Sequence, residues 1–451
     1  MRSIALLTPY TGDNLGDGAI QEAMIHNIRA RWPEVRITGL TLSPEQTAKL
    51  HGVPCRLLTN LSIRYFSSSV AERHRGRAES HVGDAEGGSG LKRALRRVPW
   101  AFTLAKSCYL SVRRIVARIE GVALHARHAI SELLDLPHAY RLVRGLDLLV
   151  ASGGGQIDDI WGGAWGHPYA MLKWALLARL AKTPFVILSV GVGELGSRTS
   201  RVFMRRALRS AAYRSYRDEG SRQLLAAMPF TALDPVCPDL ALSYPIGPGA
   251  EDIEHSRAIL RIGINPISYL RSGSWPVASD SLHGQYLGIL AAFIEDRLRE
   301  GHEVVLFPGD RGDHHVIADL SRRLHESLPA GLRERLSTPA MTTAAQLIGL
   351  LRSFDIVVAS RLHSVILAHL VGVPVLAISY ERKVRTQMDA FGQSAYCLDI
   401  HRLAGADLDA GFERLRGDRK YVQDQLRDRS RQANAEIQSQ YDLVLRQTWQ
   451  R

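Results

Sequence analysis

Residues 354–379 read FDIVVASRLHSVILAHLVGVPVLAIS: an apolar run, a short polar turn, a longer apolar segment and a second apolar run. We interpret them as a strand over Phe354–Ala359, a helix that continues to Gly372, and a strand over Val373–Ser379. Continuous apolar strands joined by a helix are typical of parallel sheets covered on both faces, because such strands are buried on both sides. The stretch therefore predicts an α/β fold.

Similar apolar runs recur along the whole chain, each followed by turn residues and a segment with helical spacing. A chain of 451 residues is long enough for two domains, and this pattern predicts two doubly wound parallel sheets. With these two included, the predicted strands are Ile4–Thr8, Val35–Leu42, Asp147–Ser152, Pro184–Val190 and Ala212–Tyr216 in the first half, and Arg261–Asn265, Glu303–Phe307, Asp355–Ser360, Pro374–Ser379 and Tyr396–Asp399 in the second.

A run of Pro and Gly separates the two halves. The stretch YPIGPGAED over residues 244–252 interrupts both helix and strand, which is typical of a linker. We place the domain boundary near Gly249, with one domain over 1–249 and the other over 250–451. Ligands of open α/β sheets bind beyond the carboxyl ends of the strands, so we expect function on those turns, where the two domains face each other across a cleft.

The net charge of +12 is unevenly distributed. Residues 62–145 hold 15 Lys and Arg against 7 Asp and Glu, and we interpret this region as a basic insertion in the first domain. No helix-turn-helix, zinc-finger or RNA-recognition pattern accompanies the charge, so we do not expect a nucleic-acid partner. Four widely spaced cysteines and the short apolar start at Ile4–Leu7 favour a reducing cytoplasm and indicate neither a signal peptide nor a membrane span.

The turn after the first predicted strand combines glycine with carboxylate and amide side chains. Gly12 and Gly16 permit a tight turn, and Asp17 is in a position to be the N-cap of a helix that runs to about Arg31. Asp13 and Asp17 would repel an anion, whereas Asp and Asn side chains suit sugar hydroxyls. A capped turn with no ligand remains the alternative interpretation.

A second glycine-rich turn follows the strand that ends at Ser152. Gly153–Gly155 would let the backbone approach a ligand closely, although a plain turn has the same composition. Trp161, Trp165 and Tyr169 come soon after. They are suited either to stacking on a sugar ring or to packing in the core.

Cationic side chains follow three strands. Arg217 comes directly after one strand, Arg361 and His363 lie between a strand and a helix N-terminus, and Lys383 and Arg382 follow the next strand. A helix N-terminus favours an anion, and histidine titrates near neutral pH. The group predicts a site that binds a phosphate or carboxylate and protonates the ligand. Ion pairs with neighbouring carboxylates and a capping histidine are the structural alternative.

Taken together and in order, these motifs resemble the polysaccharide pyruvyl transferase family. The motifs that carry the resemblance are Gly12-Asp13-Asn14-Leu15-Gly16-Asp17, Gly153–Gly155, Ser189-Val190-Gly191-Val192-Gly193, Arg217-Asp218-x-x-Ser221, Pro238-Asp239, Ser360-Arg361-Leu362-His363 and Tyr380-x-x-Lys383. The resemblance implies two Rossmann-like domains similar to the GT-B glycosyltransferases. It also implies phosphoenolpyruvate as donor, a glycan as acceptor, and a pyruvate ketal as product.

The same resemblance assigns roles to the cations. Arg361 and His363 match the family's R-x-H pair at the donor site, which makes both candidate catalytic residues. Arg217 and Lys383 join Arg361 as candidates for binding phosphoenolpyruvate. We expect protonation of the methylene carbon of phosphoenolpyruvate to create an electrophilic centre that a sugar hydroxyl attacks. This chemistry requires no metal and no organic cofactor.

The first domain is expected to bind the acceptor and the second the donor. Candidate acceptor-binding residues are Asp13, Asn14, Asp17, Gly154 and Gly155. The acceptor is expected to be a polysaccharide or a lipid-linked glycan. Two other functions fit the same pattern: a nucleotide-sugar glycosyltransferase of the GT-B type, and a non-catalytic glycan-binding homologue.

Two segments depart from the family pattern. The segment Phe307–His314 lies where many members carry a differently arranged histidine-containing stretch, and the basic insertion over 62–145 is not part of the family core. Within the insertion, Leu91–Glu120 alternates apolar and basic residues. This pattern predicts a helix that attaches the enzyme to the inner face of an anionic membrane. The alternative is that its apolar face packs on the first domain.

Overall fold

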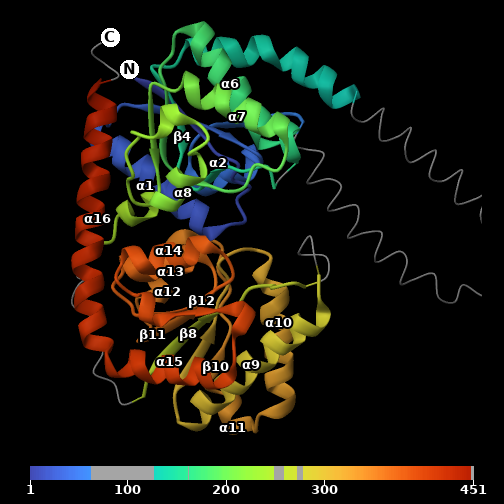
Figure 1. Cartoon of the computed structure of the whole chain (residues 1–451), viewed down its shortest axis with the longest axis vertical. Helices are drawn as coiled ribbons and strands as arrows, with labels where there is room; N and C mark the ends of the chain where they lie inside the picture. The colour runs from blue at the N-terminus through green and yellow to red at the C-terminus, as the bar shows by residue number, and fades with distance from the viewer. Residues whose placement is uncertain (62–125, 161, 248–258, 272–277, 448–451) are drawn as a thin grey trace, which may run out of the picture.

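The computed structural model describes residues 1–61, 126–160, 162–247, 259–271 and 278–447, which form two α/β domains placed end to end (Figure 1). The first domain contains a fully parallel sheet in the order β3-β2-β1-β4-β6-β5, with β7 also paired to β6. Its strands are β1 Ser3–Leu7, β2 Arg36–Thr41, β3 Cys55–Leu57, β4 Leu148–Ser152, β5 Gly155–Ile157, β6 Phe185–Val192 and β7 Tyr213–Tyr216.

The second domain repeats the same architecture with a parallel sheet in the order β10-β9-β8-β11-β12-β13. Its strands are β8 Arg261–Asn265, β9 Glu303–Leu306, β10 Leu336–Ser337, β11 Ile356–Ala359, β12 Val375–Ser379 and β13 Cys397–Asp399. The strand order changes direction between β1 and β4 in the first sheet and between β8 and β11 in the second. Ligands of doubly wound folds bind at such a switch point, so the turns after these four strands are the expected places for a site.

Every strand predicted from the sequence is present, and the α/β prediction with two doubly wound sheets is confirmed. Three short strands were not predicted: β3, β5 and β10. They have three, three and two residues, and β3 and β10 are only partly buried. Apolar periodicity cannot identify a strand of that length.

Helices cover both faces of each sheet. The first domain contains α1 Leu15–Arg31, α2 Pro44–His51, a helix over 126–144, α6 His167–Ala181, α7 Arg198–Ser210 and α8 Glu219–Leu224, with the short 3₁₀ helices η1 Gly163–Trp165, η2 Pro229–Thr231 and η3 Leu240–Ser243. The second contains α9 Asp280–Arg299, α10 Asp313–Ser327, α11 Ala330–Arg333, α12 Ala344–Leu351, α13 Leu362–Leu370, α14 Arg382–Ala390, α15 Gly405–Gly417 and α16 Arg419–Gln447, with η4 Ser394–Tyr396 and η5 Ile400–Arg402.

Two apolar cores result from this layering. On one face of the first sheet, residues of β4 and β6 pack with α6, α7 and the helix over 126–144. On the other face, α1 and η3 form a core that continues without interruption into the second domain. Part of the predicted basic insertion is thus the ordinary crossover helix between β3 and β4, with Ala139 and Val143 buried.

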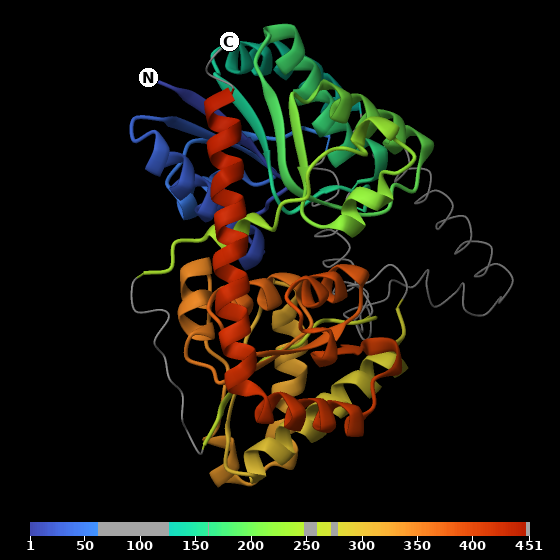
Figure 2. The same ribbon diagram turned by 60° about the vertical axis from the view of Figure 1, so that its left-hand side comes forward.

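Helix α16 spans both domains (Figures 1 and 2). It begins beside the second domain and ends against the first, where Tyr441 is fully buried. There Gln440 Nε2 donates to Ser189 Oγ over 3.0 Å, and Arg31 Nε lies 2.7 Å from Asp442 Oδ1. The last helix of the chain therefore completes the core of the first domain.

Three sequence-based expectations lie outside the described residues: the boundary near Gly249, the amphipathic helix over Leu91–Glu120, and Trp161. None of the helices in the described ranges is long and apolar enough to cross a membrane.

Replacing Tyr441 by Ala should lower the free energy of unfolding by about 3–5 kcal/mol, because truncating a buried aromatic side chain leaves a cavity. Urea denaturation followed by fluorescence measures this loss. Tyr421→Ala on the same helix is the matched control, since its side chain is 64% exposed and its loss should change stability little. Equal effects of the two substitutions would show that α16 does not contribute to the core of the first domain.

Candidate functional site

The candidate site forms where the carboxyl ends of the two sheets meet. The turn after β1 contacts the turn after β9: Leu15 N donates to Gly309 O over 3.2 Å, and Arg311 N donates to Asp13 O over 3.2 Å. The side chains of Arg311 and Asp13 also pair at 3.4 Å. The two domains are thus held in contact by the turns that doubly wound folds use for ligands.

Asn14, not Asp17, caps helix α1. Its side-chain oxygen accepts from Gly16 N at 2.9 Å and Asp17 N at 3.1 Å, as expected of an N-cap. The prediction that Asp17 is the cap was wrong because the helix begins earlier, at Leu15. Asp17 instead lies in the first turn and is free to face the other domain.

A single buried carboxylate connects the two domains at this point. The side chain of Asp239 is 0% exposed; its Oδ2 lies 3.3 Å from Arg217 Nη1 and 3.8 Å from His363 Nε2. Burial alone would raise the pKa of Asp239, but His363, then Arg217 and the Ala241 N–H, lower it to about 2. Asp239 and Arg217 belong to the first domain and His363 to the second.

The approach of His363 requires glycine at position 16. A Cβ atom added to Gly16 would lie 2.1 Å from His363 Cβ and 2.4 Å from its Nδ1. His363 is the second residue of α13, so the N-terminal turns of α1 and α13 meet here. The sequence predicted a tight turn at Gly16, and in the structure the same glycine also gives room for a histidine of the other domain.

Asp17 and Gly154 lie next to this contact. A Cβ added to Gly154 would be 3.2 Å from Asp17 Oδ1, and Gly154 has a φ of 67° that favours glycine. Burial raises the pKa of the Asp17 carboxyl, and Asp239 adds to the rise, while His363 and Arg217 oppose it. Of the five predicted acceptor-binding residues, Asp17 lies within electrostatic range of His363, and Gly154 lies next to Asp17.

The other three predicted acceptor-binding residues have different surroundings. Asp13 accepts from Gln46 Nε2 at 3.1 Å and pairs with Arg311. The side-chain oxygen of Asn14 is used by the helix cap. Gly155 forms part of β5 rather than a turn, with its backbone exposed.

Arg361 is bound to a buried carboxylate. Its Nη2 lies 2.6 Å from Asp313 Oδ1 and its Nε 3.0 Å from the same oxygen. Although burial opposes the charge, the Asp313 carboxylate raises the pKa of Arg361 above its usual value. Asp310 lies further away, at 3.9 Å. The backbone N–H of Arg361 donates to Asn265 Oδ1 over 3.2 Å, which fixes the turn after β11 to the end of β8.

Lys383 pairs with its neighbour Glu381. Their charged atoms are 2.8 Å apart, and the side chains are 38% and 44% exposed. Next to them, Arg382 Nη2 donates to Gly220 O of the first domain over 2.9 Å. Arg361 and Lys383 therefore follow the neighbouring strands β11 and β12 of the second sheet, Arg217 follows β7 of the first sheet, and each of the three has a carboxylate partner.

Asp158, which follows β5, adds an unusual carboxyl group to this region. Burial raises the pKa of Asp158 to about 6, although Ile160 N–H and Lys383 oppose the rise. A Cβ added to Gly193 would lie 3.0 Å from Asp158 Cβ. Asp158 is therefore close to the turn after β6 and within electrostatic range of Lys383.

Sequence reasoning identified the cations of this site and missed most of its acids. Asp239 was quoted for the Pro238-Asp239 motif without a role, and Asp310 and Asp313 lie in the segment that departs from the family pattern. In the sequence, Asp239 looks like any aspartate that caps a short helix. Its contact with His363 is visible only in the structure, because the two residues belong to different domains.

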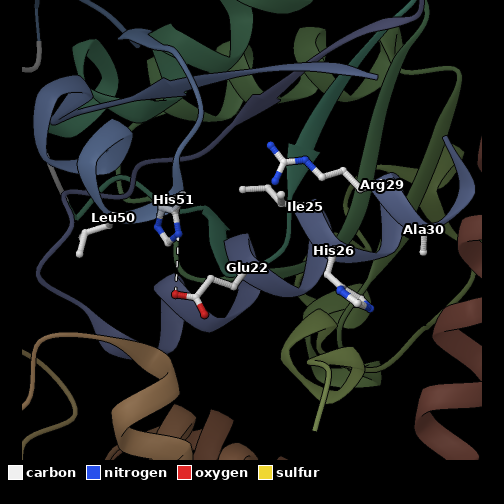
Figure 3. Close-up of a pocket in the computed structure, with 7 residues that line it drawn as sticks. All are labelled: Glu22, Ile25, His26, Arg29, Ala30, Leu50 and His51. Atoms are coloured by element: carbon white, nitrogen blue, oxygen red, sulfur yellow. Dashed lines mark ion pairs between the residues drawn. The ribbon is translucent and has the colours of Figure 1, made fainter. Parts of the chain in front are cut away.

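A separate cavity of about 500 Å³ lies between α1 and α2 (Figure 3). In it, Nδ1 of the buried His51 side chain is 3.8 Å from Glu22 Oε1, and Tyr244 donates to Glu22 Oε2 over 2.7 Å. Burial lowers the pKa of His51 to about 4, so this histidine is neutral at neutral pH. The cavity shares no lining residue with the inter-domain cluster.

The fold and the inter-domain site define a GT-B-like protein, and solved structures of that fold superpose on nearly the whole chain. Anabaena HepE in complex with UDP matches with a TM-score of 0.51 and 12% identity, covering 99% of this chain and 100% of that one. UDP-GlcNAc 2-epimerase from Methanocaldococcus jannaschii matches with a TM-score of 0.50 and 10% identity, covering 92% of each chain. At these identities the similarity shows the fold alone.

The chain belongs to the polysaccharide pyruvyl transferase family. The sequence model of that family matches residues 14–382, which include Asn14, Asp239, Arg361 and His363. A comparison with curated proteins finds no match.

Asp158→Asn should stabilise the protein in a pH-dependent way. Because burial raises the pKa of Asp158 to about 6, folding disfavours its charged form, and wild-type stability falls as pH rises through about 4 to 6. Removing the charge should raise the free energy of unfolding by roughly 2 kcal/mol near pH 7.5 and by little near pH 4.

Asp159→Asn is the matched control for this measurement by denaturant titration. Asp159 accepts from Gly196 N and Ser197 N, and these and other hydrogen bonds lower its pKa despite partial burial. Its neutralisation should reduce stability at neutral pH. The same sign for both variants would contradict the burial of Asp158.

Proposed function

We propose that this chain transfers a pyruvyl group from phosphoenolpyruvate to two hydroxyls of a glycan, forming a pyruvate ketal. The observation that carries the proposal is that Arg217 and His363 both lie next to the buried carboxylate of Asp239. It places a cation and a titratable acid at the junction of two domains, in a chain of the pyruvyl transferase family.

The donor is proposed to bind on the side of the second domain. Lys383 and Glu381 are both more than a third exposed, and an ion pair of that kind is worth less than about 1 kcal/mol. A phosphate or carboxylate of phosphoenolpyruvate can therefore displace Glu381. Arg361 keeps its guanidinium fixed by Asp313, which orients the edge that faces the ligand. Arg217 supplies the third cation from the first domain.

His363 is proposed to protonate the methylene carbon of phosphoenolpyruvate, converting it to a methyl group. The adjacent carbon becomes electrophilic and forms a bond to one sugar hydroxyl, which releases a proton. A second hydroxyl then displaces phosphate and releases another proton. One released proton restores the imidazolium and the other leaves with phosphate, so the reaction is balanced without an oxidant or reductant.

The acceptor is proposed to bind on the side of the first domain. Asp17 interacts electrostatically with His363, and Gly154 lies next to Asp17. The raised pKa of Asp17 suits a carboxylate that accepts the proton of a hydroxyl. Asp13, Asn14 and Gly155 extend the proposed acceptor surface away from the acid. A lipid-linked glycan or a polysaccharide would both present the required pair of hydroxyls.

The test is phosphate release from phosphoenolpyruvate by the purified protein, with a panel of glycans and no added metal. We expect release only with a suitable acceptor, and thermal stabilisation by phosphoenolpyruvate. Stabilisation by UDP- or GDP-sugars alone would instead favour a glycosyltransferase. Binding of glycan without turnover would favour a non-catalytic homologue.

His363→Ala should lower turnover by about two to four orders of magnitude, because it removes the proposed general acid. The steady-state rate of phosphate release measures the effect. His325→Ala, at an exposed position of α10 in the same domain, is the control and should be unaffected. Turnover of His363→Ala within a factor of a few of wild type would exclude this residue as the acid.

Asp239→Asn tests a positioning role. The carboxylate is charged throughout the assay range, since its pKa is about 2, and its Oδ2 lies 3.8 Å from His363 Nε2, where it can orient the imidazole. Asparagine retains the oxygen that accepts from Ala241 N over 3.0 Å. We expect kcat for phosphate release to fall, because a misplaced imidazole acts less effectively on the reacting carbon, with a smaller change in KM for phosphoenolpyruvate.

Asp234→Asn is the matched control, because Asp234 is a similarly buried carboxylate bound to Arg214 in the same domain. It should cost stability and leave kcat for phosphate release unchanged. An unchanged kcat in Asp239→Asn would refute the positioning role while leaving the proposed reaction intact.

A further inference from the structure

Helix α7 carries a one-sided set of arginines on the outside of the first domain. Its sequence is RTSRVFMRRALRS, with no acidic residue. Ser200, Met204, Ala207 and Leu208 are buried against the domain. The opposite side is exposed and holds five arginines: Arg198, Arg201, Arg205, Arg206 and Arg209.

These arginines differ from those on other exposed helices of the protein. None of the five forms an ion pair with any carboxylate in the described ranges, whereas Arg299 of α9 pairs with Glu295 and Asp296, and Arg416 of α15 pairs with Glu413. Two have neutral contacts: Arg201 donates to Leu195 O over 2.8 Å, and Arg209 lies 5.1 Å from the Phe230 ring. Their positive charge is thus not neutralised within the described structure.

Exposed apolar side chains accompany the charge. Trp165 of η1 is 59% exposed and packs edge-on against Phe203 of α7, with ring centroids 5.4 Å apart. Val202 of α7 is 43% exposed and lies between the arginines on the helix surface. The aromatic residues Trp165 and Tyr169, for which sugar stacking was one interpretation, therefore form part of this basic and aromatic face.

The face lies next to the proposed reaction site. Asp159 accepts from Gly196 N and Ser197 N directly before α7, and its neighbour Asp158 is in electrostatic range of Lys383. Helix α7 packs on the face of the first sheet opposite the core that contains α16, and both views show it away from that helix (Figures 1 and 2). The segment with Asp158 and Asp159 thus connects the proposed reaction site to the start of α7.

We propose that this face of α7, with Trp165, binds the surface of an anionic phospholipid membrane. Unpaired arginines are attracted to anionic headgroups, and tryptophan favours the boundary between headgroups and acyl chains. The exposed aliphatic Val202, beside Trp165, favours a membrane over a nucleic acid, for which charge and aromatic rings suffice. If the proposed function holds, a protein bound to the membrane through α7 would present its reaction site to a glycan whose lipid anchor lies in the same membrane.

Co-sedimentation of the full chain with vesicles tests the proposal without any substrate. Phosphatidylcholine vesicles are compared with vesicles that also contain phosphatidylglycerol, at low and high salt. We expect binding to the mixed vesicles only, and weakening by salt. The triple variant Arg198→Glu, Arg205→Glu, Arg206→Glu should bind at least about tenfold more weakly, and Trp165→Ala several-fold more weakly.

The matched control reverses three exposed arginines of the second domain: Arg323, Arg402 and Arg429, each to Glu. It changes the net charge equally and should bind the mixed vesicles as wild type does. Thermal melting verifies that each variant is folded, and phosphate release with a water-soluble acceptor should be unchanged in the α7 variant. Full binding by that variant, or binding to heparin with none to vesicles, would overturn the proposal whether or not the proposed reaction is found.

Discussion

The arrangement of the two domains depends on the burial of one negative charge. Asp239 has no exposed surface, and a lone carboxylate in that environment would be strongly destabilising. Arg217 stabilises it from its own domain, and His363 approaches it from the other. Because the charge requires both neighbours, the relative position of the domains and the position of the histidine side chain are linked through the same atoms. Gly16 makes the approach sterically feasible.

The sequence contained enough information for the fold and for one half of the site. Long buried strands such as β6 are apolar runs of strand length bounded by turn residues, so they were predicted, whereas β10, with two residues, has no pattern to detect. The cations Arg217, Arg361 and Lys383 were found because they follow strands. Their partners were not, because Asp313 and Asp239 are distant in sequence from Arg361 and His363, and only the packing of the sheets brings them together.

The glycines near the site illustrate the same limit. The sequence predicted a tight turn at Gly16, and Gly191 belongs to one of the motifs that carry the family resemblance. In the structure the groups that approach are protein side chains, His363 at Gly16 and the guanidinium of Arg217 at Gly191. Glycine reveals that space is required at a position. It does not reveal what fills that space, because the absence of a side chain leaves no chemical preference behind.

The path of α16 has a consequence for synthesis on the ribosome. The core between α1 and η3 is closed by Tyr441 near the end of this helix, although both of its other elements are translated much earlier. A nascent first domain therefore exposes apolar surface until the whole second domain has been synthesised. Chaperones would encounter that surface for most of the translation time, and a premature stop codon ahead of α16 would leave two domains with complete sheets but one incomplete core.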